Sequence, residues 1–128
     1  MESEVIKELV TIRVYVFIIM CVFVVWFSLK ILESLKNIIS GFKRAMDEYF
    51  SDQMLKMIEI GKYEDVIEEC KVKLEKYPNH VDAVWYLARA YYYTESNKLS
   101  LECFERVIYL SPTWEESATP YIEKLNAR

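Results

Sequence analysis

Glycine, proline and histidine are scarce in this chain, whose 128 residues include two glycines, three prolines and one histidine. Tight hairpins between strands depend on glycine-rich turns, and half-buried strands depend on strict alternation of apolar and polar residues. The sequence has few of the former and no clear run of the latter. We therefore expect helices rather than a sheet, in a chain with room for one modest domain.

The residue groupings on which catalysis and metal binding depend are also missing. His80 is the single histidine and follows Asn79 in a turn, where solvation or helix capping is its expected role. No nucleophile–base pair, cluster of metal ligands or glycine-rich phosphate loop is visible. We expect no enzymatic activity, no cofactor and no metal.

Positive charge is in short supply beyond residue 46. Residues 1–46 hold six basic and four acidic residues, and residues 47–128 hold ten basic and sixteen acidic, which gives the net charge of −4. An acidic region does not neutralise phosphates, so nucleic acid is not an expected partner. The chain has three cysteines and no C-x-x-C pair: Cys21, Cys70 and Cys103. They are typical of free thiols in a reducing compartment, and a disulfide between Cys70 and Cys103 is the alternative.

An uncharged apolar run, VYVFIIMCVFVVWFSL, lies between Arg13 and Lys30. Its sixteen residues rise about 24 Å as a helix, and flanking apolar residues extend them toward a hydrocarbon core of about 30 Å. Tyr15 and Trp26 lie near its ends, where aromatic rings prefer the membrane interface. A core of about 80 other residues is too small to surround this run, and no signal-peptide cleavage site follows it. We predict a transmembrane helix at residues 13–31.

The flanking charges predict how this helix is oriented. The N-terminal flank carries Lys7 and Arg13, and the C-terminal flank carries more basic residues: Lys30, Lys36, Lys43 and Arg44. Because basic residues concentrate on the cytoplasmic side, we expect a single-pass membrane protein whose larger part is cytoplasmic.

An apolar seam follows the predicted membrane helix. Its members recur at alternating steps of three and four residues: Leu32, Leu35, Ile39, Phe42, Met46 and Tyr49. This spacing is typical of a coiled coil or of a helix packed lengthwise on another. Packing on the domain that follows is the first interpretation, self-association into a homo-oligomer the second, and a helix lying on the membrane the third.

From Asp47 onward the chain repeats itself with a period of about 34 residues, which is the signature length of one class of helix–turn–helix repeat. Residues 61–80 align with residues 95–114 without a gap. The matching pairs are Gly61 with Glu95, Val66 with Ser100, Cys70 with Phe104, and Pro78 with Pro112. The region therefore reads as two copies of one helical unit.

The chain resembles the tetratricopeptide repeat family, most closely in residues 81–114. The residues at the family's packing positions there are Val84, Leu87, Ala88, Tyr91, Ser100, Phe104, Val107 and Pro112. Residues 47–80 keep the second helix of the repeat better than the first. Gln53, Met54 and Lys73 depart from the family pattern in this first unit.

The resemblance implies a concave groove lined by the first helix of each repeat. The family's groove positions that we carry over as a candidate binding surface are Leu55, Ile58, Asp82, Trp85, Arg89, Tyr92 and Tyr93. Trp, Tyr and Arg are the residue types that dominate binding hot spots, and Arg89 suits a carboxylate of a bound peptide. The alternative is that the chain's own N-terminal helix covers these aromatic side chains.

The sequence therefore predicts an all-α chain: a transmembrane helix followed by a short α-solenoid of the tetratricopeptide type. Its segments are a flank at 1–12, the membrane helix at 13–31, a heptad helix at 32–46, two repeats at 47–80 and 81–114, and a capping helix at 115–128. The function that this organisation implies is that of a membrane-anchored adaptor for a protein partner. The alternative is a constitutive subunit of a larger membrane complex.

Overall fold

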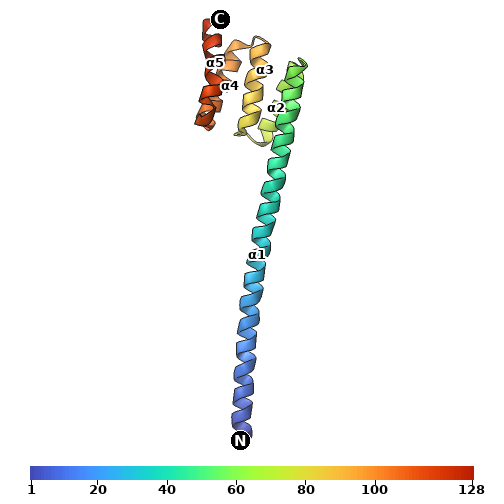
Figure 1. Ribbon diagram of the computed structural model, residues 1–128, viewed down its shortest axis with the longest axis vertical. Helices are drawn as coiled ribbons and strands as arrows, with labels where there is room; N and C mark the ends of the chain where they lie inside the picture. Colours follow the sequence, from blue (N-terminus) through green and yellow to red (C-terminus); the bar gives the residue numbers. More distant parts are fainter. The chain divides into compact units, whose positions relative to one another are not determined.

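The computed structural model describes residues 1–128 and contains helices only (Figure 1). Its elements are α1 (Glu2–Glu59), α2 (Tyr63–Lys76), α3 (Val81–Tyr93), α4 (Asn97–Leu110), the 3₁₀ helix η1 (Pro112–Trp114) and α5 (Glu115–Ala127). The prediction of an all-α chain is confirmed. The chain divides into two units, Met1–Arg44 and Ala45–Arg128, which we describe separately.

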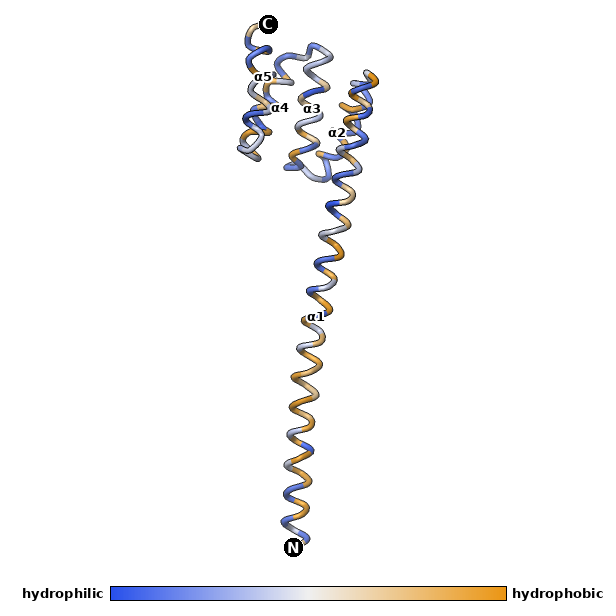
Figure 2. Tube along the Cα trace, in the orientation of Figure 1, coloured by the Kyte–Doolittle hydropathy of each residue, from blue (hydrophilic) through white to orange (hydrophobic).

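The first unit consists of one helical stretch of α1. An 18-residue window of this helix has a mean hydropathy of 2.5, and none of the window is buried. Figure 2 shows the predominance of hydrophobic residues along it. The expected long apolar N-terminal helix is thus present, and by length and composition it is a candidate membrane span.

The seam residues of α1 have no cover within their own units. In the first unit Leu32, Leu35, Ile39 and Phe42 are each at least 47 % exposed. In the second unit Met46 and Tyr49 are exposed as well. The expected membrane helix, heptad helix and first repeat helix all lie within α1, which has no break before Glu59.

The core of the second unit lies on two sides of α3. One cluster joins the end of α1 and α2 to α3, through Met54, Ile58, Val66, Cys70, Leu87, Ala90 and Tyr91. The other joins α3 to α4 and α5, through Val84, Trp85, Ala88, Phe104, Val107, Ala118 and Leu125. Small side chains let the helices approach closely, and the buried Ser100 Oγ donates to the Ala88 carbonyl at 2.9 Å. Because α3 contributes residues to both clusters, it is the central helix of this unit.

The turn after α1 and the turn after α3 have the same backbone hydrogen bonds. Lys62 N donates to the Met57 carbonyl at 2.9 Å, and in the turn after α3 Ser96 N donates to the Tyr91 carbonyl at 3.0 Å. Gly61 and Glu95 occupy matching positions with positive φ of 80° and 61°. This is the Schellman pattern that ends a helix on a left-handed residue. Both α2 and α4 have 14 residues, and their ends are separated by the same interval as Gly61 and Glu95.

Candidate interaction surface

Trp85 and Ile58 belong to the core and not to an exposed groove. The Trp85 side chain is 8 % exposed, and its ring centroid lies 4.9 Å from that of Trp114 and 5.8 Å from that of Tyr121. Ile58 is 5 % exposed and packs with Met54. The expectation that these two side chains line a binding groove is corrected: α5 and η1 cover Trp85, and the α1–α2–α3 cluster encloses Ile58.

The other aromatic groove candidates are only partly available. The Tyr92 ring lies 5.1 Å from the Tyr121 ring, and the Arg128 guanidinium stands 4.2 Å from its centroid. Tyr93 stacks on Tyr63 at 5.1 Å and remains 40 % exposed. Of all these rings, Tyr93 therefore offers the most surface to another molecule.

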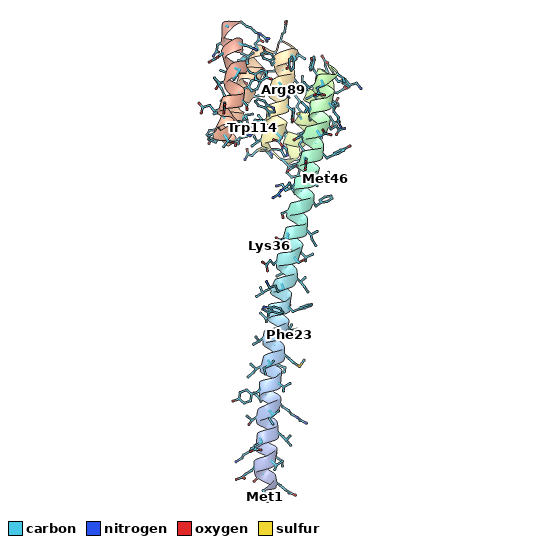
Figure 3. All side chains as sticks on the ribbon, in the orientation of Figure 1. Met1, Phe23, Lys36, Met46, Arg89 and Trp114 are labelled. Atoms are coloured by element: carbon cyan, nitrogen blue, oxygen red, sulfur yellow. The ribbon has the colours of Figure 1, made fainter.

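Beside them, Arg89 carries a positive charge without a carboxylate partner. Its Nε is buried and has no hydrogen-bond acceptor, and none of the ion pairs in the chain involves it. Its charge acts on two neighbouring tyrosines. Burial raises the pKa of Tyr86 and of Tyr121, and the positive charge of Arg89 opposes that rise in both. Arg89, labelled in Figure 3, is thus a cation whose charge acts on tyrosine side chains.

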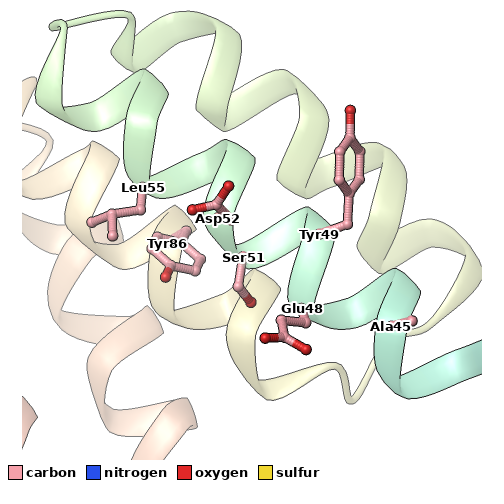
Figure 4. A pocket seen from close by; sticks show the side chains of 7 residues that line it. All are labelled: Ala45, Glu48, Tyr49, Ser51, Asp52, Leu55 and Tyr86. Atoms are coloured by element: carbon pink, nitrogen blue, oxygen red, sulfur yellow. The ribbon is translucent and has the colours of Figure 1, made fainter. Parts of the chain in front are cut away.

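A shallow pocket of about 540 Å³ lies between the end of α1 and α3 (Figure 4). The residues that line it are Ala45, Glu48, Tyr49, Ser51, Asp52, Leu55 and Tyr86. Leu55, Asp52 and Tyr86 lie close together in Figure 4, which places an apolar side chain and an aromatic ring beside a carboxylate. Such a mixture can hold the aliphatic stem of a side chain and pair with its charged end.

A hydrogen bond connects the two helices next to this pocket. Ser51 Oγ donates to Asp82 Oδ2 at 2.9 Å. Asp52 also forms an exposed ion pair with Lys56 at 2.7 Å, a kind of contact that contributes little to stability. With Glu48 and Asp82, Asp52 gives this end of the surface an excess of negative charge.

The candidate surface follows from helical spacing on both helices. On α1 it contains Glu48, Ser51, Asp52 and Leu55, and on α3 it contains Asp82, Tyr86, Arg89 and Tyr93. Residues three and four apart share one side of a helix, so each set forms one row. We call these eight residues the α1–α3 face.

Sequence reasoning missed Asp52 and Tyr86 as members of this face. The expected groove residues were those at the groove positions of the family pattern, and neither Asp52 nor Tyr86 occupies a groove position. A signal was nevertheless present, because Asp52 lies four residues after Glu48 and Tyr86 four residues after Asp82. Completing each row by helical spacing finds both.

Adjoining this face, His80 joins α1 to the start of α3. His80 Nδ1 accepts a hydrogen bond from Ala83 N at 3.1 Å, which caps α3. The ring proton therefore resides on Nε2, which lies 2.9 Å from Asp47 Oδ1. Lys73 Nζ lies 3.4 Å from the same oxygen. With both ring nitrogens engaged, His80 has the capping role that its position in the turn indicated.

The carboxyl of Asp47 responds to these neighbours. Partial burial acts to raise its pKa, but the hydrogen bond from His80 and the positive charge and hydrogen bond of Lys73 outweigh burial, and the pKa is lowered. Asp47 is therefore ionised at neutral pH, as its contacts require. The cluster is a structural link between helices.

The two cysteines of the second unit are unreactive. Cys70 is buried, Cys103 is partly buried, and neither forms a disulfide. Burial raises the pKa of Cys70 to about 12 and that of Cys103 to about 11. Because the thiolate is the nucleophile, neither thiol is activated at neutral pH. The structure also contains no group of three or more histidine, cysteine or acidic residues arranged to hold a metal ion.

Comparison of the chain with protein-family models, with curated proteins and with solved structures finds no significant match.

Proposed function

We propose that this chain is a membrane-anchored adaptor of the tetratricopeptide type, which holds a protein partner at the bilayer through the α1–α3 face. The single observation that carries the proposal is this face itself. Next to the buried core of the second unit it presents a pocket, a row of carboxylates and a cation without a carboxylate partner. The proposed side of the membrane is cytoplasmic, because basic residues are more numerous after the apolar run than before it.

The repeat assignment is supported by the backbone. The two turns have the same hydrogen bonds, and α2 and α4 have the same length. The spacing between the two turns, and between the two helices, equals the spacing between Pro78 and Pro112. A repeat of helix–turn–helix units generates extended surfaces used for binding. Two such units and α5 form a small version of such a surface.

The charges of the face define what it binds. Glu48 and Asp52 line the pocket and favour a lysine or arginine, whose stem packs on Leu55 and Tyr86. Arg89 favours a carboxylate further along the same segment. The proposed partner is therefore a protein segment that carries a basic residue followed or preceded by an acidic one.

A capture experiment with the full chain in lipid nanodiscs tests this function. Wild-type protein should retain a defined set of proteins from a membrane extract, and Asp52→Lys with Tyr86→Ala should lose them. Tyr109→Ala, at the 85 % exposed Tyr109 of α4, is the matched control and should retain them. Equal capture by all three proteins would contradict the role of the α1–α3 face.

The second candidate function is a constitutive subunit of a membrane complex. The exposed seam residues favour it, because an uncovered apolar row on a helix requires a partner. An obligate subunit aggregates when it is extracted alone in mild detergent, whereas an adaptor stays dispersed and binds reversibly. Sedimentation of the purified chain separates the two.

A further inference from the structure

The seam of α1 extends into the apolar run in the same register. Counting back from Leu32 and Leu35 by sevens, the a and d positions of the heptad fall on Val14, Ile18, Cys21, Val25 and Ser28. All of these belong to one uninterrupted helix. The alternating steps of three and four residues from Leu32 to Tyr49 are typical of a left-handed supercoil with another helix. In the apolar run, where every residue is uncharged, the same register is carried back through the continuous helix.

Side-chain size distinguishes this row from the rest of the apolar run. The run contains five aromatic residues, Tyr15, Phe17, Phe23, Trp26 and Phe27, and none of them occupies an a or d position. Its two small side chains, Cys21 and Ser28, both occupy d positions. Ser28 Oγ donates to the Val24 carbonyl at 2.8 Å, so its hydroxyl is satisfied within the helix. Small side chains on one row allow close helix–helix approach in a membrane.

After the apolar run, the distribution of polar and apolar residues also distinguishes the a and d positions from the others. The polar residues of this segment that lie on the outer b, c and f positions are Lys30, Glu33, Ser34, Asn37, Ser40 and Arg44. The Lys30–Glu33 ion pair of 3.0 Å is part of this outer surface. The a and d positions are all apolar: Leu32, Leu35, Ile39 and Phe42.

The remaining two positions determine the direction of a partner helix. Lys36 and Lys43 occupy e positions, and Ile31 and Ile38 occupy g positions. In a parallel pair each g residue meets an e residue of the other helix, so the stems of the lysines cover the isoleucines. An antiparallel pair of identical helices would place lysine against lysine.

We propose that the Val14–Phe42 part of α1 pairs in parallel, through its a and d residues, with the same segment of a second copy of this chain. Copies of one single-pass protein enter the bilayer in one orientation, so their helices are parallel and in register; this part of the inference rests on α1 crossing the membrane. Three of the four a residues in this segment, Ile18, Val25 and Ile39, are β-branched, and Leu35 occupies a d position. β-Branched residues at a with leucine at d favour two strands over three.

Disulfide trapping at Cys21 tests the membrane half of the interface. In a parallel pair the two Cys21 residues face each other across a d layer, within the range that a disulfide spans. Oxidation of membranes that contain the full chain, with copper phenanthroline, should give a species of twice 15.3 kDa on a non-reducing gel. Cys21→Ser should abolish it.

Two adjacent isoleucines provide the matched comparison. In the Cys21→Ser chain, Ile18→Cys at an a position should restore the cross-linked species, and Ile19→Cys at a b position should not. Equal cross-linking at both sites, or none at either, would overturn the proposal. Partnership with a different helix would also give no cross-link between copies.

The aqueous half is tested separately, so that failure of membrane insertion does not decide the result. The mass of the full chain in detergent, measured by sedimentation, should be that of two copies. Leu35→Asn should reduce it two-fold, and Ser34→Asn, one residue away on the outer surface, should leave it unchanged. A wild-type chain with the mass of one copy would overturn the proposal, as would a Leu35→Asn chain that keeps the mass of two.

Discussion

Two residues with positive φ, Gly61 and Glu95, show how one turn is built from different side chains. A glycine adopts the left-handed region without strain, whereas a side chain with a Cβ costs roughly 1 kcal/mol or more there. Gly61 lies at φ 80° and Glu95 at φ 61°. The alignment of residues 61–80 with residues 95–114 matches Gly61 with Glu95, but a conformation shared by glycine and glutamate is visible only in the backbone.

Glu95→Gly is therefore expected to stabilise the second unit by about 0.5–1 kcal/mol, since it removes strain from the folded state. Urea unfolding of the full chain in detergent, followed by tryptophan fluorescence, measures the change. Glu95→Ala is the control, because it removes the carboxylate and retains the strain. An equal gain from both substitutions would point to charge rather than backbone conformation.

The His80 cluster makes a second prediction at the residue scale. His80→Ala removes the cap of Ala83 N and leaves Asp47 without its closest partner, so it should cost about 1–2 kcal/mol. The same unfolding assay applies. Asn79→Ala, at an exposed neighbouring position, should change stability by less than about 0.5 kcal/mol.

The lowered pKa of Asp47 predicts a dependence on acid. A group whose pKa is lower when folded stabilises the fold above its unfolded pKa of about 4, and this contribution disappears as pH falls through the folded value. The free energy of unfolding of the wild-type chain should thus decline below about pH 4. Asp47→Asn should be less stable at neutral pH and should lose less stability on acidification. If the free energy of unfolding fell equally with pH in both proteins, Asp47 would be excluded as a source of the acid sensitivity.

At the scale of the helix, α5 decides which aromatic side chains are exposed. The sequence predicted a capping helix at 115–128, and α5 spans Glu115–Ala127. Its composition does not reveal that Tyr121 packs on the rings of Trp85, Tyr92 and Phe104. Family positions alone could not predict the loss of Trp85 from the surface, because the covering helix lies outside the two repeats.

Tyr121→Ala should consequently cost about 2–4 kcal/mol, since it removes one ring from a cluster of four. It should also shift the tryptophan emission to longer wavelength, because Trp85 gains contact with water. Glu123→Ala, an exposed position on the same helix, should leave both properties unchanged. A stable Tyr121→Ala protein with unshifted emission would show that α5 does not cover Trp85 in solution.

The helix rows also explain which part of the candidate surface could be predicted. Leu55, Asp82, Arg89 and Tyr93 were expected from groove positions and belong to the α1–α3 face. Asp52 and Tyr86 were missed, although helical spacing from Glu48 and Asp82 indicates both. Ile58 was misplaced because its neighbours on α2 and α3, and not its own position in the repeat, determine its burial.

For the whole molecule, the apolar run and the acidic second unit define the proposed arrangement at a membrane. The absence of sheet signals predicted the all-α fold, and hydropathy predicted the long apolar helix. Neither feature identifies a partner, because recognition depends on which side chains gather on one face. That gathering results from the packing of α1 against α3.

The proposed topology predicts how the cysteines label. An impermeant maleimide added outside intact cells that express the chain should leave Cys70 and Cys103 unmodified. After permeabilisation and unfolding both should react, because unfolding exposes thiols that are buried or half-buried in the structure. Labelling of unfolded Cys103 without permeabilisation would reverse the proposed orientation.

The most direct test of the adaptor function is photocross-linking from the α1–α3 face in living cells. A benzophenone amino acid introduced at Leu55, in the pocket, should form one discrete adduct with a membrane-associated protein. The same probe at Tyr109, on α4, should not form it. A discrete adduct at Leu55 that Asp52→Lys abolishes is the expected result; adducts that are absent at Leu55, or identical at both positions, would contradict a binding role for this face.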